Sequence, residues 1–170
     1  MIATRLAEFS DAELISALLT ANTADRGGML MGQWRREVIE KRIANGQPII
    51  VAIGDRDQLL GALLTSEKGF DDALPVRAML TAWPGRSDAY VYGPVCIAHE
   101  ARGLGVLEAL HAKLRETFPG REAILFIRAD NPRSLKAHLR LGMREVARYE
   151  LAAETFVVLS DAPDGPVAAA

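Results

Sequence analysis

Apolar residues along the chain follow two spacings, one typical of strands and one typical of helices. Helical spacing recurs in 33–44 and 102–118 and through Leu14, Leu18 and Leu19. Strands and helices therefore mix along the chain, which predicts an α/β fold. Short apolar or alternating runs predict strands at 2–6, 48–53, 59–65, 90–97, 123–127, 143–151 and 155–159.

The helix expected at 102–118 lies between two apolar strands. A strand, a helix and a strand in this order form a β-α-β unit, which predicts that the two strands pair in parallel. The next helix is expected to start with Asn131 as its cap and Pro132 in its first turn, and to end before Gly142. The last two strands are expected to form a hairpin.

Three further segments give weaker signals for secondary structure. Ser10 and Glu13 have the spacing of a capping box, so the first helix is expected to start there. The loop at 22–32 is rich in glycine with apolar residues at its middle, and such a loop can cover a pocket. In the segment 69–87, prolines interrupt a short apolar run at 76–83, which fits either a helix or an extra strand.

Composition narrows the class of protein. The chain has 170 residues, of which 49% are hydrophobic and 25% charged, as expected for one globular domain, here residues 1–160. The tail at 161–170 has too few large apolar groups to pack, and we expect it to be disordered. The net charge of −2 argues against a nucleic-acid partner.

The single cysteine, Cys96, excludes a disulfide framework and a zinc site built on paired thiolates, and we expect no metal. Charged residues interrupt every apolar run before 18 residues, so no membrane span is expected. The first residues show no pattern of an export signal. The single cysteine fits a reducing, cytoplasmic setting, which we expect for this protein.

The most informative stretch follows the strand at 90–97 and reads Arg-Gly-Leu-Gly-Val-Leu at 102–107. The first amides of a helix have no internal acceptors and lie at the positive end of the helix dipole, so small residues here favour an anion site. Arg-Gly-x-Gly after a strand is equally typical of an ordinary tight turn. The spacings of the Rossmann and P-loop motifs are not met.

Two neighbouring features strengthen the anion-site hypothesis. Gly93-Pro94 interrupts the strand, and because proline cannot donate to a ladder we expect a bulge or a local parting of strands there. Backbone groups of Val95 and Ile97 would then be available to an extended ligand. The helix that starts after Asn131 opens at the carboxyl end of the neighbouring strand, where open α/β sheets bind ligands.

These residues resemble the GCN5-related N-acetyltransferase (GNAT) superfamily, which transfers an acyl group from acyl coenzyme A (acyl-CoA) to an amine. The resemblance is strong over 90–143 and looser in the order of the flanking elements. The family carries Arg or Gln, two variable residues, Gly, one variable residue, then Gly or Ala. Arg102 and Gly105 match this motif, and Leu107 departs from it at the last position.

A second family motif has Asn, two variable residues, Ala or Ser, a later Tyr and a Gly-Phe ending. Asn131 and Ser134 match it, whereas His138 replaces the Tyr and Gly142-Met143 replaces Gly-Phe. The resemblance implies a mixed, largely antiparallel central sheet with a parallel β-α-β unit and flanking helices.

The resemblance also implies acetyl-CoA as co-substrate. The amides at 102–107 would bind its pyrophosphate, the main chain at 95–97 would pair with its pantetheine arm, and Asn131 would face the same arm. The residues so implied in cofactor binding are Val95, Cys96, Ile97, Arg102, Gly103, Leu104, Gly105, Val106, Leu107, Asn131 and Ser134.

Both departures have two interpretations. Leu107 shares a helical face with Leu110 and Leu114, so its side chain can turn into the core and leave its amide available, or its bulk can weaken cofactor binding. The family's Tyr protonates the departing CoA thiolate, and an imidazolium at His138 can do the same. Alternatively, His138 packs beside neighbouring leucines and donates a hydrogen bond to a carbonyl.

Other chemistry-bearing residues fit simpler roles. His99-Glu100 does not start a zinc-protease motif, because Gly103 stands where the second His is required. His111 and Cys96 are expected in the core. The basic face of the second helix, formed by Arg35, Arg36, Lys41 and Arg42, is expected to be solvated.

We therefore predict an N-acetyltransferase that moves an acetyl group from acetyl-CoA to a primary amine of a small molecule or peptide by direct attack. The rival hypotheses are a non-catalytic acyl-CoA sensor and an unrelated nucleotide-binding protein. The general base is not readable, although Tyr92, Glu67 and Glu100 are candidates. An edge strand could support a homodimer.

Overall fold

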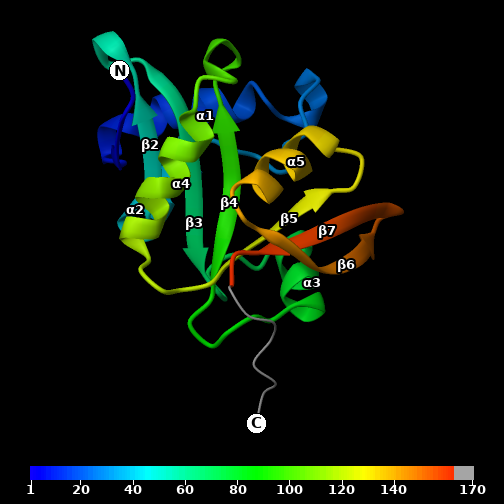
Figure 1. Cartoon of the computed structure of the whole chain (residues 1–170). Coiled ribbons are helices and arrows are strands. Elements are labelled where there is room, and N and C mark those ends of the chain that lie inside the picture. Colours follow the sequence, from blue (N-terminus) through cyan, green and yellow to red (C-terminus); the bar gives the residue numbers. More distant parts are fainter. Residues whose placement is uncertain (163–170) are drawn as a thin grey trace. The chain divides into compact units, whose positions relative to one another are not determined.

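The structure is a computed structural model that describes residues 1–162 (Figure 1). The helices are α1 (Ala12–Thr20), α2 (Arg36–Ala44), α3 (Leu74–Ala82), α4 (Val106–Thr117) and α5 (Pro132–Arg140). The strands are β1 (Ala3–Leu6), β2 (Ile49–Ile53), β3 (Leu59–Glu67), β4 (Tyr90–Ile97), β5 (Ala123–Arg128), β6 (Arg144–Leu151) and β7 (Glu154–Ser160).

Within residues 1–162 the strands form a seven-stranded sheet in the order β1-β2-β3-β4-β5-β7-β6. Four neighbouring pairs, β1 with β2, β2 with β3, β5 with β7 and β6 with β7, are antiparallel. The pair β4 and β5 is parallel, with Tyr90 opposite Ala123 and Val91 opposite Ile124. The mixed, largely antiparallel sheet with a parallel β-α-β unit is therefore confirmed.

The chain divides into two compact units, and β4 contributes to both. The first unit contains Met1–Thr65 and Gly93–Pro119, and the second contains Ser66–Tyr92 and the residues from Gly120 on. Each unit has a hydrophobic core of its own. A single functional domain over 1–160 stays a prediction. In the predicted disordered tail, Asp161 accepts a hydrogen bond from the Ala123 amide at 2.7 Å and Ala162 is buried, whereas residues 163–170 lie outside the described part of the chain.

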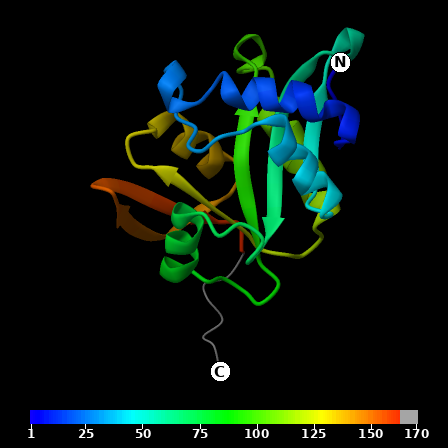
Figure 2. The ribbon, with the colours of Figure 1, turned by 180° about the vertical axis from the view of Figure 1, so that it is seen from behind.

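The first unit is a layered arrangement in which helices cover both faces of its strands. Figure 1 shows α4 in front of β2 and β3, and Figure 2 shows α1 and α2 on the other face. Gly61 allows α4 to approach, because a Cβ there would lie 2.9 Å from Val106. The core between the strands and the helices α1 and α2 consists of Ala12, Ile15, Leu19, Ile39, Ile49, Val51, Ala62, Leu64 and Cys96.

The second unit also has helices on opposite faces of its strands, with α5 in front in Figure 1 and α3 in front in Figure 2. The apolar run at 76–83, for which the sequence allowed either a helix or an extra strand, belongs to the helix α3. Pro75 lies in the first turn of this helix, where proline is tolerated. Tyr149 and Phe156 stack in parallel with ring centroids 5.0 Å apart. The buried core of this unit consists of Val76, Met79, Ala89, Val91, Ile124 and Val158.

Two predicted helix starts are wrong. The capping box involves Glu8 and Asp11 rather than Ser10 and Glu13, because the Asp11 carboxylate accepts a hydrogen bond from the Glu8 amide at 2.7 Å. The helix α1 accordingly begins at Ala12. The helix expected from residue 102 begins at Val106, so residues 102–105 form a loop that precedes α4.

The predicted solvated basic face of α2 is confirmed for three of its four residues, which are exposed, and is wrong for Arg42. Arg42 is buried, with its guanidinium 5.6 Å from the centroid of the Trp34 ring and one nitrogen 3.3 Å from the Thr65 carbonyl. A long cationic side chain can cover apolar surface with its stem while its head finds polar partners. None of the helices in residues 1–162 is both long and apolar enough to cross a membrane.

Candidate active site

The loop between β4 and α4 has a backbone that only glycine adopts easily. After a short 3-10 turn at His99–Ala101, Gly103 has φ +78° and Gly105 has φ +82°. Both lie in the left-handed region, where a Cβ is strained. A Cβ at either position would meet no atom within 4 Å, so conformation rather than crowding requires these glycines.

This loop presents several main-chain N–H groups. In the part of the chain that the structure describes, the amides of Gly103, Gly105, Val106 and Leu107 have no hydrogen-bond acceptor. The amides of Arg102 and Leu104 bond within the turn, but both distances are 3.4 Å. The α4 dipole adds positive potential at the same point. The predicted anion-binding arrangement of main-chain donors is therefore present.

The Arg102 side chain ties this loop to two other segments of the first unit. Its Nη2 donates to the Asn22 Oδ1 at 2.9 Å, and its Nε donates to the Ile97 carbonyl at 3.4 Å. Asn22 in turn donates to the Leu18 carbonyl at 2.8 Å and accepts at its own carbonyl from the Leu30 amide. Sequence reasoning missed Asn22, because nothing in the local pattern connects it to a residue 80 positions away.

Cys96 faces the core of the first unit. It is 7% exposed, and its Sγ lies 3.8 Å from the Leu18 carbonyl oxygen. Burial raises the pKa of the Cys96 thiol to about 11, which excludes a thiolate nucleophile at neutral pH. Val95 and Ile97, which alternate with Cys96 along β4, are only half-buried. The predicted core position of Cys96 is therefore confirmed.

The parallel pairing of β4 is short. Among the described residues, its register with β5 covers Tyr90 and Val91 and stops before Gly93-Pro94. The proline removes one donor from the ladder at this point. This agrees with the expected interruption of the strand ahead of Val95 and Ile97.

In the second unit, Asn131 caps α5 as expected. Its Oδ1 accepts a hydrogen bond from the Ser134 amide at 3.2 Å, and Pro132 occupies the first turn. The capping bond satisfies one of the amides that a helix start leaves open. The observed role of Asn131 is therefore to start the helix that carries His138.

His138 is 2% exposed, and both of its ring nitrogens have partners. The Nδ1 atom lies 2.8 Å from the Ser134 carbonyl oxygen, and the Nε2 atom lies 3.0 Å from the Tyr92 hydroxyl. A carbonyl can only accept, so Nδ1 carries a proton. In the neutral ring, Nε2 is then the acceptor and the Tyr92 hydroxyl donates to it.

Tyr92 is the last residue of the second unit before Gly93 and is 3% exposed. Burial raises the pKa of its hydroxyl well above its usual range, so the phenol stays protonated at neutral pH. Its ring meets the His138 ring edge to face at 5.4 Å. The sequence named Tyr92 as one of three possible bases, but gave no signal that it pairs with His138.

The other two candidate bases have partners of their own. Glu67 pairs with Arg121 at 2.7 Å, and the hydrogen bond from this guanidinium lowers the pKa of the carboxyl. Glu100 accepts from the Gln58 amide at 3.2 Å on the surface of the first unit. In α4 the buried stripe runs through Val106, Leu110 and Leu114, and Leu107 is only half-buried, so the expectation that it turns into the core is met only in part.

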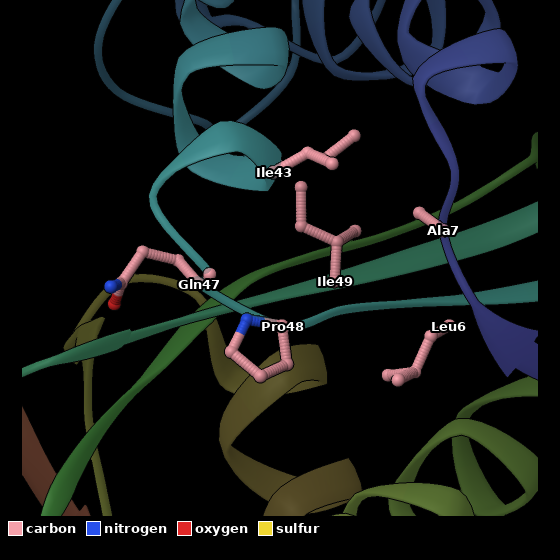
Figure 3. A pocket seen from close by; sticks show the side chains of 7 residues that line it. Leu6, Ala7, Ile43, Gln47, Pro48 and Ile49 are labelled. Atoms are coloured by element: carbon pink, nitrogen blue, oxygen red, sulfur yellow. The ribbon is translucent and has the colours of Figure 1, made fainter.

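A separate pocket of about 180 Å³ lies elsewhere in the first unit (Figure 3). Its volume is smaller than that of typical ligand sites, which hold about 300 to 1,000 Å³. Its lining contains none of the predicted site residues. The lining residues come from the ends of β1 and α2 and the start of β2 and are Leu6, Ala7, Ile43, Gly46, Gln47, Pro48 and Ile49.

Comparison by sequence finds no matching protein-family model and no matching curated protein. Comparison by structure finds a candidate acetyltransferase from Salmonella typhimurium, solved with its cofactor acetyl-CoA, at TM-score 0.69 and 16% identity over 99% of both chains. A GNAT-family acetyltransferase from Streptococcus agalactiae matches at TM-score 0.72 and 16% identity over 96% of both chains. The chain has the GNAT fold.

A third similar structure is a ribosomal-protein-alanine N-acetyltransferase from Brucella melitensis, at TM-score 0.67 and 20% identity. It matches over 93% of this chain and 98% of its own. At these identities the likeness establishes the GNAT fold, which the sequence motifs implied. Activity has to be argued from the residues themselves.

Proposed function

We propose that this protein is an N-acetyltransferase that moves an acetyl group from acetyl-CoA to a primary amine of a small molecule or peptide. The observation that carries the proposal is the row of main-chain donors at the start of α4, shaped by Gly103 and Gly105, on a GNAT fold. Amides of this kind bind phosphate groups without any cationic side chain.

In this proposal, the amides at 102–107 bind the pyrophosphate of acetyl-CoA. The arrangement suits a diphosphate because the donors of Gly103, Gly105, Val106 and Leu107 follow one another along the chain at the positive end of the α4 dipole. The main chain of Val95, Cys96 and Ile97 pairs with the pantetheine arm. Asn131 and Ser134 are proposed to act on the same arm through the start of α5.

The chemical step is direct attack of the neutral amine on the thioester carbonyl carbon. Holding the amine near attack distance lowers the barrier, because an encounter between free molecules is no longer needed. This effect contributes several kcal/mol here, and in the best-oriented reactions it reaches about 7 to 11 kcal/mol. A main-chain amide near Cys96 polarises the thioester oxygen. A proton from the Tyr92 and His138 pair then neutralises the departing thiolate.

The acceptor is proposed only as a class. A primary amine is consistent with the structural similarity to the ribosomal-protein-alanine N-acetyltransferase from Brucella melitensis. Residues 22–32 and 69–87 are proposed to select the acceptor, because they lie outside the matched motifs. A cytoplasmic location is part of the proposal, and the unbridged, buried thiol of Cys96 is consistent with a reducing compartment.

The first test combines binding with turnover. Isothermal titration calorimetry should show acetyl-CoA binding, with weaker binding of ATP and NAD. A thiol reagent should then detect CoA released in the presence of 2-phenylethylamine, putrescine, or peptides with a free N-terminal alanine or lysine. Binding without thiol release against every amine would indicate a sensor, and preference for ATP or NAD would contradict the CoA site.

A second test changes one glycine of the loop. Gly105→Ala should weaken acetyl-CoA binding about tenfold, because leaving φ +82° turns donors away from the pyrophosphate and costs about 1 to 2 kcal/mol. Gly120→Ala is the matched control, since Gly120 has φ +74°, also meets no atom within 4 Å, and lies in the other unit. Equal affinities of both variants, measured by calorimetry, would contradict the role of the loop.

A further inference from the structure

The side chains of Tyr92 and His138 form a buried, hydrogen-bonded pair in the second unit. His138 is 2% exposed, its Nδ1 faces the Ser134 carbonyl, and its Nε2 faces the Tyr92 hydroxyl. A proton that leaves or reaches Nε2 along this hydrogen bond passes through the Tyr92 oxygen. Proton exchange between Nε2 and another group therefore goes by way of Tyr92 as long as this hydrogen bond is kept.

We propose that Tyr92 relays protons between His138 and the reacting groups, so that the pair serves as both the general base and the general acid. This inference rests on the proposed acetyl transfer and deepens it. It supplies the base that the sequence left unassigned. It also changes the role of His138 from a direct donor to a proton store one hydrogen bond away.

The steps balance in protons and electrons. Attack of the amine forms a C–N bond and leaves one excess proton on the nitrogen of the tetrahedral intermediate. That proton moves to the Tyr92 oxygen as the Tyr92 proton moves to His138 Nε2. When the C–S bond breaks and its electron pair stays on sulfur, the Nε2 proton returns to the Tyr92 oxygen as the Tyr92 proton passes to the thiolate.

The structure explains why two residues are needed. Burial raises the pKa of the Tyr92 hydroxyl, so a phenolate left behind by Tyr92 alone would be costly. Proton exchange with His138 avoids this phenolate, because the oxygen gains one proton as it gives up another. The Nδ1 proton stays on the ring throughout, and its hydrogen bond to the Ser134 carbonyl holds the ring in orientation.

The position of Tyr92 in the chain supports contact with the reacting groups. It directly precedes Gly93-Pro94, and Val95, which follows this pair, starts the segment proposed to hold the pantetheine arm. The other tyrosine of this unit with a defined acceptor, Tyr149, donates to the Pro75 carbonyl at 3.0 Å. Tyr149 thus offers a control hydroxyl with a similar bond and no role in the relay.

The test compares Tyr92→Phe, His138→Phe and the double variant with Tyr149→Phe, using acetyl-CoA and the amine of the panel that the unchanged protein acetylates fastest. Each relay variant should lower kcat about 100-fold, the size typical of general acid and base groups. The KM for acetyl-CoA should change less than about threefold, and the double variant should be no slower than either single one. Tyr149→Phe should keep its kcat.

Normal turnover of Tyr92→Phe, or losses that multiply in the double variant, would overturn the relay while leaving acetyl transfer intact. Failure of the unchanged protein to bind acetyl-CoA or to acetylate any amine would overturn the proposed function and the relay together. The double variant also guards against misfolding, because it removes both partners and leaves neither polar group buried alone.

A spectroscopic measurement tests the hydrogen bond without turnover. Nitrogen-15 NMR should show His138 with its proton on Nδ1, with the signal assigned by its loss in His138→Phe. Tyr92→Phe should shift the Nε2 resonance, and Tyr149→Phe should leave it in place. An unshifted Nε2 resonance in Tyr92→Phe would overturn the relay.

Discussion

Single residues in this protein take their chemistry from partners far away in the sequence. His138 lies 46 positions from Tyr92, and Arg102 lies 80 positions from Asn22. The sequence indicated that His138 could act as an acid or donate to a carbonyl, and the structure shows the bond to a carbonyl. The hydrogen bond to Tyr92 could not be inferred, because it depends on how α5 meets the start of β4.

Cys96 provides a direct test of burial at one residue. With a pKa of about 11, about one thiol in a thousand is ionised at pH 8, and only the thiolate attacks a disulfide reagent. We expect the native protein to react with an aromatic disulfide reagent at least about 100-fold more slowly than the protein in guanidinium chloride. Because the chain has a single cysteine, the absorbance of the released thiolate reports Cys96 alone.

The reaction rate of the Cys96 thiol should also depend on pH in a known direction. Raising the pH toward the raised pKa should increase the native rate, because the thiolate fraction grows about tenfold for each pH unit below it. Cys96→Ala gives the background rate. Equal rates in native and unfolded protein would show that the thiol is exposed and would contradict its place in the core of the first unit.

At the scale of elements, strands and capped helices were predictable where local signals agreed. The structure confirms the predicted β-α-β unit, the cap at Asn131 and the final hairpin of β6 and β7. In these places the apolar runs, Pro132 and Gly142 indicate the same element boundaries. The helix α3 was left open because Pro75 reads as a breaker, yet it stands in the first turn.

Two of the wrong expectations, the start of α1 and the solvation of Arg42, have a common physical cause. Ser10 and Glu13 had the right spacing for a capping box, but Asp11 also pairs with Arg5 at 2.7 Å, and this ion pair shifts the helix start. Arg42 was placed on a solvated face, although its contacts with Trp34 and the Thr65 carbonyl bury it. In each case a side chain from another segment outweighed the local pattern.

The cap of α5 carries a prediction at this scale. Asn131→Ala removes the acceptor of the Ser134 amide and should lower the free energy of unfolding by about 1 kcal/mol, the usual cost of losing a helix cap. Asn45→Ala is the control, because the Asn45 side chain donates to the Lys41 carbonyl at the exposed end of α2. Its cost should stay below about 0.5 kcal/mol in urea unfolding.

An equal loss in both variants would contradict a specific role for the cap. The same variants report on the candidate site, because α5 carries His138. Asn131→Ala could lower kcat and yet leave the His138 Nε2 resonance at its position in the unchanged protein. That result would mean that the variant changes the orientation of α5 and keeps the hydrogen bond to Tyr92. This separates the start of the helix from the hydrogen bond in its last turn.

At the scale of the whole molecule, the two units have different chemical content. The first unit contains the glycine loop and the main-chain donors, and the second contains the Tyr92 and His138 pair. The sequence placed both sets on one stretch from 90 to 143, because the resemblance follows chain order. The division within β4, between Tyr92 and Gly93, has no sequence signal beyond the Gly-Pro pair.

Both units should also lose stability in acid. Hydrogen bonds from Arg5 lower the pKa of Asp11 in the first unit, and those from Arg121 lower the pKa of Glu67 in the second. Their ordinary pKa values are 3.8 and 4.5. A carboxyl whose pKa is lower in the folded protein stabilises the fold at higher pH and loses this contribution as the pH falls through the folded pKa.

The buried carboxyl of Glu122 should contribute most clearly to this acid sensitivity. Burial alone would raise its pKa, but hydrogen bonds from Ser160, Trp83 and the Arg86 amide outweigh burial, and the net pKa is lowered. The free energy of unfolding in urea should therefore be constant from about pH 7 to 5.5 and fall below about pH 4.5. Glu122→Gln should be less stable at neutral pH and show a shallower fall in acid, because it has no carboxylate to protonate. A variant that matches the unchanged protein at both pH 7 and pH 3 would show that the Glu122 charge does not stabilise the fold.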